Sequence, residues 1–292
     1  MISSLLLERR SPLVFLLAAG ALARGVTAEG RVLAIVDPRG VLQVLGDSAD
    51  NRILVERTGM PGEFRVVGFD TLVNGRPSVV LRSESVTVRL GEGADHVQVD
   101  GLIGGSVALY GGPGDDVLSL GCPVIGGRAL LHGGEGEDLL DVQDTLVNGS
   151  LHLVGGPGDD EVLMFFAVGN DELRIEGGPG EDSISVTRQL QRGALAIDGG
   201  SGDDRIELGH DEITLDTLVI GGSGEDRVSV TDCEIGGALG VYLGSQADDL
   251  TVGMLAIEGA VVLDGGSGRD GLVDLGGNDF AAGPPTVRRF EF

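Results

Sequence analysis

The sequence predicts an all-β fold, a single-domain parallel β-helix (β-solenoid) of about ten 22-residue coils. An aspartate recurs every 22 residues from Asp116 to Asp270, and Asp95 precedes Asp116 by 21 residues. Asn51 lies 44 residues before Asp95, so it occupies the same position two repeats earlier. A fixed period of this length is typical of solenoids, in which each repeat buries its apolar face only against its neighbours. We call this recurring position the anchor.

Apolar and polar residues alternate on both sides of each anchor. Residues two and four positions after it are apolar, as are residues seven and nine positions before it; around Asp182 these are Ile184, Val186, Ile175 and Leu173. This period of two predicts two short strands per coil, each with one buried face. A third short strand is expected at a weaker apolar position between them, represented by Val124, Leu146, Val168 and Leu190.

The alternation also sets the expected domain boundaries. Phe64 and Val66 fall nine and seven positions before Val73, which predicts a coil that has the strands but not the acid. We therefore expect one repeat domain over 29–275. Asp274 falls where a buried residue is due, and residues 276–292 are expected to form a C-terminal cap, because the open end of a solenoid needs cover.

The composition restricts the partners. The net charge is −26, all 20 basic residues are Arg, Trp is absent, and aromatic residues make up 3% of the chain. Such an acidic chain is a poor match for nucleic acid or an anionic membrane, because both are polyanions. It suits cations or basic partners.

The N-terminus has the layout of a signal peptide. Arg9 and Arg10 precede an apolar run from Leu13 to Ala23, which is followed by small residues suited to cleavage. The run is too short to span a bilayer. We therefore predict that residues 1–28 form a signal peptide and that the mature chain is secreted or at the cell surface, without a transmembrane segment. The alternative is an uncleaved N-terminal anchor.

The two cysteines are not expected to form a disulfide with each other. Cys122 and Cys233 are 111 residues apart, which is about five coils. Stacked strands place them roughly 24 Å apart along the solenoid, whereas a disulfide needs Cα atoms within about 7 Å. We expect both to act as small buried apolar residues.

The turn that leads into each anchor contains the motif that is a candidate for ligand binding. Six consecutive turns, from Gly111–Asp116 to Gly221–Asp226, read Gly-Gly-x-Gly-(Asp/Glu)-Asp. They resemble the hemolysin-type calcium-binding repeat of RTX proteins, whose nonapeptide is G-G-x-G-x-D followed by alternating apolar residues. In that family, calcium lies between stacked turns and is held by Asp carboxylates and glycine carbonyls. Here the motif occurs once per 22 residues instead of once per nine, so only one edge of the solenoid could bind metal.

The resemblance implies Ca²⁺ as the bound ion and a set of ligand residues. The implied ligands are the anchors Asp116, Asp138, Asp160, Asp182, Asp204 and Asp226, with the turn glycines Gly112, Gly114, Gly134, Gly136, Gly156, Gly158, Gly178, Gly180, Gly200, Gly202, Gly222 and Gly224. The turns at Asp95, Asp248 and Asp270 depart from the motif, so the strongest sites are expected between Asp116 and Asp226.

Electrostatics independently favours a cation. Carboxylates stacked in register lie about 5 Å apart, and each like-charge contact costs on the order of 1 to 3 kcal/mol. Carboxylate and carbonyl oxygens are the ligands that Ca²⁺ prefers, and the retention of three glycines per turn favours this interpretation. The competing interpretation is that each Asp accepts a hydrogen bond that closes its own turn, with its charge left to solvent.

These observations predict a calcium-binding β-solenoid with a structural, cell-surface or adhesive role, and not an enzyme. Its expected partners are calcium ions and cell-surface or extracellular-matrix components. The alternative is a polysaccharide-acting β-helix enzyme, a lyase or hydrolase. Against it, the acids are repetitive, Lys is absent, and the four histidines occupy different positions in the repeat.

Overall fold

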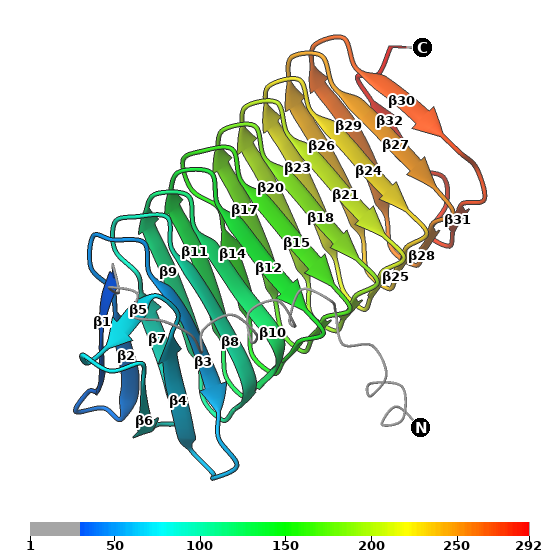
Figure 1. The fold of residues 1–292 in the computed structure, drawn as a ribbon. Coiled ribbons are helices and arrows are strands. Elements are labelled where there is room, and N and C mark those ends of the chain that lie inside the picture. Colours follow the sequence, from blue (N-terminus) through cyan, green and yellow to red (C-terminus); the bar gives the residue numbers. More distant parts are fainter. Residues whose placement is uncertain (1–29, 292) are drawn as a thin grey trace.

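The protein is a stack of β-coils (Figure 1), which confirms the predicted fold class. The computed structural model describes residues 30–291, except for the side chains of Cys122 and Pro123. Over these residues the chain is all-β, without a helix that could cross a membrane, and it forms about nine turns with a 22-residue spacing. The predicted signal peptide, residues 1–28, lies outside the described residues.

Two long sheets form the walls of the solenoid. The first is a thirteen-stranded sheet in which strands of successive coils pair in parallel from β2 onward. Its strands, in spatial order, are β5 (Thr71–Val73), β1 (Gly30–Val36), β2 (Val41–Leu45), β7 (Ser85–Arg89), β9 (Val107–Pro113), β11 (Ala129–Glu135), β14 (Leu151–Val154), β17 (Leu173–Pro179), β20 (Leu195–Ser201), β23 (Thr217–Ser223), β26 (Leu239–Ser245), β29 (Val261–Ser267) and β32 (Thr286–Arg288).

The second sheet contains the strands that follow each anchor. They are β3 (Arg52–Arg57), β8 (His96–Ile103), β10 (Val117–Ile125), β12 (Leu139–Gln143), β15 (Glu161–Phe165), β18 (Ser183–Thr187), β21 (Arg205–Gly209), β24 (Arg227–Thr231), β27 (Asp249–Gly253) and β30 (Gly271–Asp274). Short strands continue each coil beyond this sheet: β13 (Leu146–Val147), β16 (Val168–Gly169), β19 (Leu190–Gln191), β22 (Glu212–Ile213), β25 (Glu234–Ile235), β28 (Ala256–Ile257) and β31 (Asp279–Phe280).

The predicted core is confirmed. Side chains two and four positions after the anchors, such as Ile184 and Val186, are buried, and so are those seven and nine positions before, such as Ile175 and Leu173. Equivalent residues stack from coil to coil, with Ile184 paired to Ile206. The interior is therefore a set of apolar columns that run along the solenoid.

The third strand exists, but the residue that it buries is one position later than predicted. Leu146 and Val168 are only half-buried, whereas Val147 is 1% exposed. Two-residue strands give no alternation from which the inward side could be read. The apolar residues from which this strand was predicted, such as Leu146 and Val168, therefore lie on the outer side of this corner.

The coil predicted around Val73 is wrong. β3 pairs in parallel with β8, so the coil of Asn51 stacks directly on that of Asp95, although 44 residues separate them. Part of the chain between them leaves the stack and forms β4 (Glu63–Gly68) and β6 (Ser78–Arg82), which pair antiparallel at the N-terminal end of the solenoid (Figure 1), before β7 rejoins the stack between β2 and β9. Alternation with a period of two describes parallel and antiparallel strands equally well.

The C-terminal end changes its packing at the expected place. Asp274 is exposed and its Oδ1 accepts the N–H of Gly276 at 2.7 Å. β32 then adds a strand to the first sheet and β31 adds one to the row of short strands, and Phe280 and Phe290 pack against the edge of the core. Residues 276–291 thus cover the last coil. Farther back, Cys233 is buried, with a pKa that burial raises to about 12.

Candidate metal site in the aspartate column

The anchor side chains form a column at the corner between the two long sheets. Each lies immediately before a strand of the second sheet, and all of them are buried, with exposed fractions of 1–2%. The six predicted ligands Asp116, Asp138, Asp160, Asp182, Asp204 and Asp226 all belong to it, as do Asp95, Asp248 and Asp270. The acids therefore point into the coil and not into solvent. We call this set of nine residues the inner column.

One oxygen of each inner carboxyl joins two coils. The backbone N–H of Asp116 donates to Oδ1 of Asp138 at 2.8 Å, and the N–H of Asp138 donates to Oδ1 of Asp160 at 2.8 Å. The pattern continues without interruption to Asp270. The interpretation that each Asp closes its own turn is therefore wrong, because these oxygens accept the N–H of the preceding coil.

The other oxygen of each inner carboxyl is buried without a hydrogen-bond partner among the described residues. This holds for Oδ2 of all nine inner aspartates. A Cβ added to Gly111 would collide with Oδ2 of Asp116 and also with the carbonyl oxygen of Gly133. Two oxygen atoms with no hydrogen between them thus border the same small space, which is unfavourable unless a proton or a cation lies there.

The twelve turn glycines proposed as ligands are explained by backbone geometry. All of them have φ between 114° and 144°, a region that L-residues rarely adopt. A Cβ on Gly112 would also collide with the carbonyl oxygen of Gly91 in the preceding coil. The same holds at Gly114, Gly134, Gly136, Gly156, Gly158, Gly178, Gly180, Gly200, Gly202, Gly222 and Gly224, each against the coil before it. Glycine retention is therefore required for coil stacking alone and is no argument for calcium.

Burial makes the inner carboxyls weak acids. Desolvation, reinforced by neighbouring aspartates, raises the pKa of Asp116 and Asp160 to about 7. The pKa of Asp138 and Asp182 rises to about 6 from the same main cause. Hydrogen bonds from the backbone lower each value and only partly offset desolvation. At neutral pH, an inner column without metal therefore holds a mixture of protonated and charged carboxyls.

The acids just before the anchors form a separate, exposed set. Asp115, Glu137, Asp159, Glu181, Asp203 and Glu225 point into solvent. The N–H of Glu137 donates to Oδ1 of Asp115 at 3.0 Å, so this outer column also links coils. Among the described residues, no three acidic, His or Cys side chains converge on one point. Any metal site at this corner would therefore depend on backbone carbonyl oxygens.

Two features of this part of the interior are not evident from the sequence. The first glycine of each motif, such as Gly111, was read as part of the turn and not as a neighbour of the carboxyl. Asp211 lies at another corner of the coil, between β21 and β22, where it is 3% exposed and accepts the N–H groups of Gln189 and Gly209. Burial raises its pKa to about 7. Asp211 follows Asp204 by seven positions, and no repeated acid at that position marks it in the sequence.

No protein-family model, curated protein or solved structure matches this chain. A functional assignment therefore depends on the geometry of the chain itself.

Proposed function

We propose that the protein is a secreted or cell-surface structural β-solenoid that binds Ca²⁺ along the inner column. The observation that carries the proposal is the row of buried Oδ2 atoms that lack hydrogen-bond partners and border glycine carbonyl oxygens. A buried charge without a partner is costly, and a divalent cation would compensate two of them at once. The stack of repeated coils supports a structural, surface or adhesive role.

The ligands would be Oδ2 atoms of neighbouring anchors and carbonyl oxygens of the first glycines. The carbonyl of Gly177, for example, accepts the N–H of Gly156 at 2.9 Å and keeps its second lone pair. Such hard oxygen donors suit Ca²⁺, which takes six to eight of them. The ion would supply charge neutralisation and would tie adjacent coils together. The alternative, a polysaccharide-acting enzyme, stays a prediction from the sequence.

The test compares inner and outer acids. We expect calcium to raise the melting temperature measured by circular dichroism, because a ligand that binds only the folded state stabilises it by RT ln(1 + [L]/Kd). The double variant Asp160→Asn/Asp182→Asn should lose part of this rise. It should also melt higher than wild type in EGTA, because two buried charges are removed. The matched control is Asp159→Asn/Glu181→Gln, which changes the same two turns on the outside and should keep the full calcium response.

Two outcomes contradict the proposal. One is a melting temperature that does not differ between calcium and EGTA at any pH. The other is a calcium response that the outer variant abolishes and the inner variant keeps, which would place the ion on the surface. In either case, protonation and not a bound metal ion would neutralise the carboxyls of the inner column.

A further inference from the structure

The outer face of the thirteen-stranded sheet is unusually apolar. In a solvated sheet, the outward residues of each strand are mostly polar. Here the outward positions are those ten, eight and six residues before each anchor, from β2 to β29, and half-buried or exposed apolar side chains occupy many of them. These are Val41, Leu45, Ala108, Tyr110, Leu130, Val154, Ala194, Ala196, Leu218, Ile220, Ala238, Tyr242, Ala260 and Val262.

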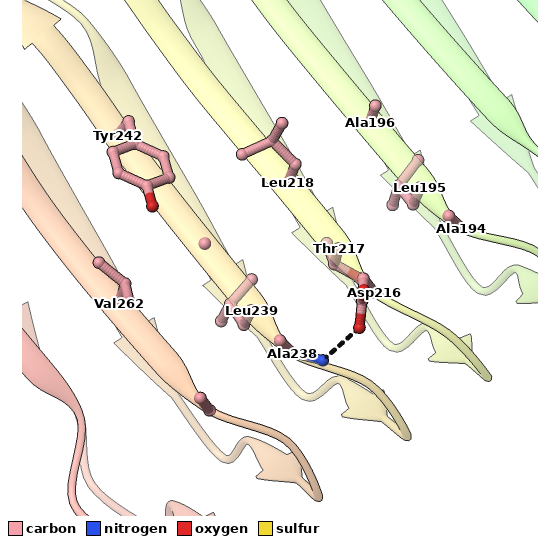
Figure 2. Close-up of a pocket in the computed structure, with 12 residues that line it drawn as sticks. Ala194, Leu195, Ala196, Asp216, Thr217, Leu218, Ala238, Leu239, Tyr242 and Val262 are labelled. Atoms are coloured by element: carbon pink, nitrogen blue, oxygen red, sulfur yellow. Dashed lines mark hydrogen bonds between the residues drawn. The ribbon is translucent and has the colours of Figure 1, made fainter.

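A shallow hollow lies in this face (Figure 2). Leu218, Tyr242 and Val262 project from the adjacent strands β23, β26 and β29. Gly240 lies beside Leu218 and Tyr242 and is paired with Val262, and it has no side chain to fill the hollow. Leu218 and Tyr242 are 38% and 40% exposed. One edge of the hollow carries a charge, where Oδ1 of Asp216 accepts the N–H of Ala238 at 2.8 Å. An apolar hollow beside an exposed aromatic ring is typical of a protein contact surface.

The charges on this face differ between its two halves. On β2, β7, β9, β11 and β14, no outward residue at these positions is acidic, although the chain carries a net charge of −26. This half carries Arg89, Arg128, His132 and His152, and the Arg89 guanidinium stacks on the Tyr110 ring at 4.8 Å. The exposed or half-buried acids of the face lie in the other half, in or directly before β17, β20 and β23, as Glu172, Glu176, Asp198 and Asp216. The same half carries one outward arginine, Arg174, and Asp264 on β29 is buried and paired with Arg289. The second half therefore has a net negative charge, which is opposite in sign to the charge of the first half.

We propose that this face binds a second copy of the chain, face to face, about a two-fold axis parallel to the strands. Such an axis places β14 against β17 of the second copy, β11 against β20, β9 against β23 and β7 against β26. Each basic half then covers a half with net negative charge, and both contacts form because the interface is isologous. A two-fold axis along the solenoid would instead set each coil on its own equivalent, basic half on basic half, which like charges disfavour.

The arrangement keeps strand direction, so equal positions in the repeat face each other. His132 then faces Asp198 of the second copy, Tyr110 faces Ile220, and Arg89 faces the Tyr242 ring at the hollow. Ten strands spaced about 4.8 Å apart, with about 17 Å of each strand in contact, cover roughly 800 Å² per copy. That is the area of a standard stable interface.

The experiment is sedimentation equilibrium of the full chain in calcium-containing buffer, which is expected to show a dimer at micromolar concentration. Leu218→Asp puts a charge into the hollow and should raise the dimer dissociation constant on the order of 100-fold. The matched control is Leu163→Asp, at an outward half-buried position on β15 of the other sheet, which should leave the dimer unchanged. Circular dichroism checks that both variants keep the β-fold.

A charge exchange tests the register. Asp198→Arg should weaken the dimer because it faces His132 of the second copy, and the double variant His132→Asp/Asp198→Arg should restore it. A monomeric wild type, or a dimer that Leu163→Asp disrupts and Leu218→Asp does not, would overturn the proposal. A wild-type monomer that binds heparin through Arg89 and Arg128 would show that the basic half of this face binds an anionic partner and not a second copy of the chain.

Discussion

Asp115 and Asp116 are neighbours in one turn, yet they have opposite environments. Asp115 is exposed, whereas Asp116 is 1% exposed. Both carboxyls accept a backbone N–H from an adjacent coil, with Glu137 donating to Asp115 and Asp95 donating to Asp116. Hydrogen bonding between coils is therefore common to both columns. What separates them is the second oxygen, which water can solvate at Asp115 and which has no partner at Asp116.

The difference between the two columns determines which acids of the motif affect the free energy of folding. The outer acids can lose their charge at little cost, because exposed charges contribute little to stability. The inner acids hold coils together through Oδ1 and oppose folding through Oδ2 whenever they are ionised. The inner column is therefore both a structural link and a site that requires a proton or a cation.

The largest effect is expected when a substitution places an acidic side chain in the interior, where no N–H group is available to donate a hydrogen bond to it. Ile184 is 1% exposed in β18, two residues after Asp182, and its backbone is already paired within the sheet. Ile184→Asp should cost about 3 to 5 kcal/mol or unfold the protein. Ser185→Asp, on the outward side, should change stability by less than about 0.5 kcal/mol. Urea unfolding checks both, and similar losses from the two variants would refute the strand register.

The pH dependence should have opposite signs with and without calcium. Burial raises the folded pKa of inner carboxyls such as Asp116 to about 7, above the unfolded value of about 3.9. The folded state therefore binds protons more tightly, and the stability of the calcium-free protein should rise as pH falls from about 7 toward 4. That contribution is lost as pH rises through the folded pKa.

With calcium bound, acidification should destabilise the protein over the same range, because the ligand carboxyls must be deprotonated. Thermal melts at several pH values, in EGTA and in calcium, measure both slopes. A shift on the order of 10 °C is expected in EGTA, because several kcal/mol are spread over the inner column. Calcium-free protein that is most stable above pH 8 would contradict the assignment of these carboxyls as desolvated.

A smaller effect is expected at Asn51, the neutral residue at the N-terminal end of the column. Its side-chain amide donates to Oδ1 of Asp47 at 3.1 Å and to the carbonyl of Ala49. Asn51→Asp removes both donors and brings two carboxylates together, so it should cost about 1 to 3 kcal/mol in EGTA. Asp95→Asn, on the next coil, should cost nothing or stabilise. Urea unfolding that ranks these two variants in the opposite order would show that the amide at Asn51 has no special role.

The sequence predicted the strands and the core because a strict period fixes which residues stack. It could not predict that the anchor points inward, because side-chain direction at a corner depends on the backbone of the glycines before it. Gly112 and Gly114, with φ near 130°, turn the chain so that Asp116 enters the coil. The extra strands at the N-terminus were also missed, although Asn74-Gly75 is a recognised hairpin signal. Both residues have positive φ there, and Val73 bridges Arg76.

The smallest effect is expected at the turn of Asp248, where the motif has lost two glycines. Oδ1 of Asp248 still accepts the N–H of Asp226 at 2.8 Å, so the inner column continues through this coil. The cost of the altered motif lies in the backbone. Gln246 has φ of 86° at the position that Gly224 occupies one coil earlier. Gln246→Gly should therefore stabilise the protein by about 0.5 kcal/mol, because relief of strain exceeds the added entropy of the unfolded chain.

The control Gln246→Ala keeps the strained φ and should bring no gain, and its calcium response should equal that of wild type. If Ala stabilises as much as Gly in urea unfolding, the effect comes from the lost side chain and not from the backbone. In that case, the glycines of the other turns would be needed for close approach between coils and not for their positive φ.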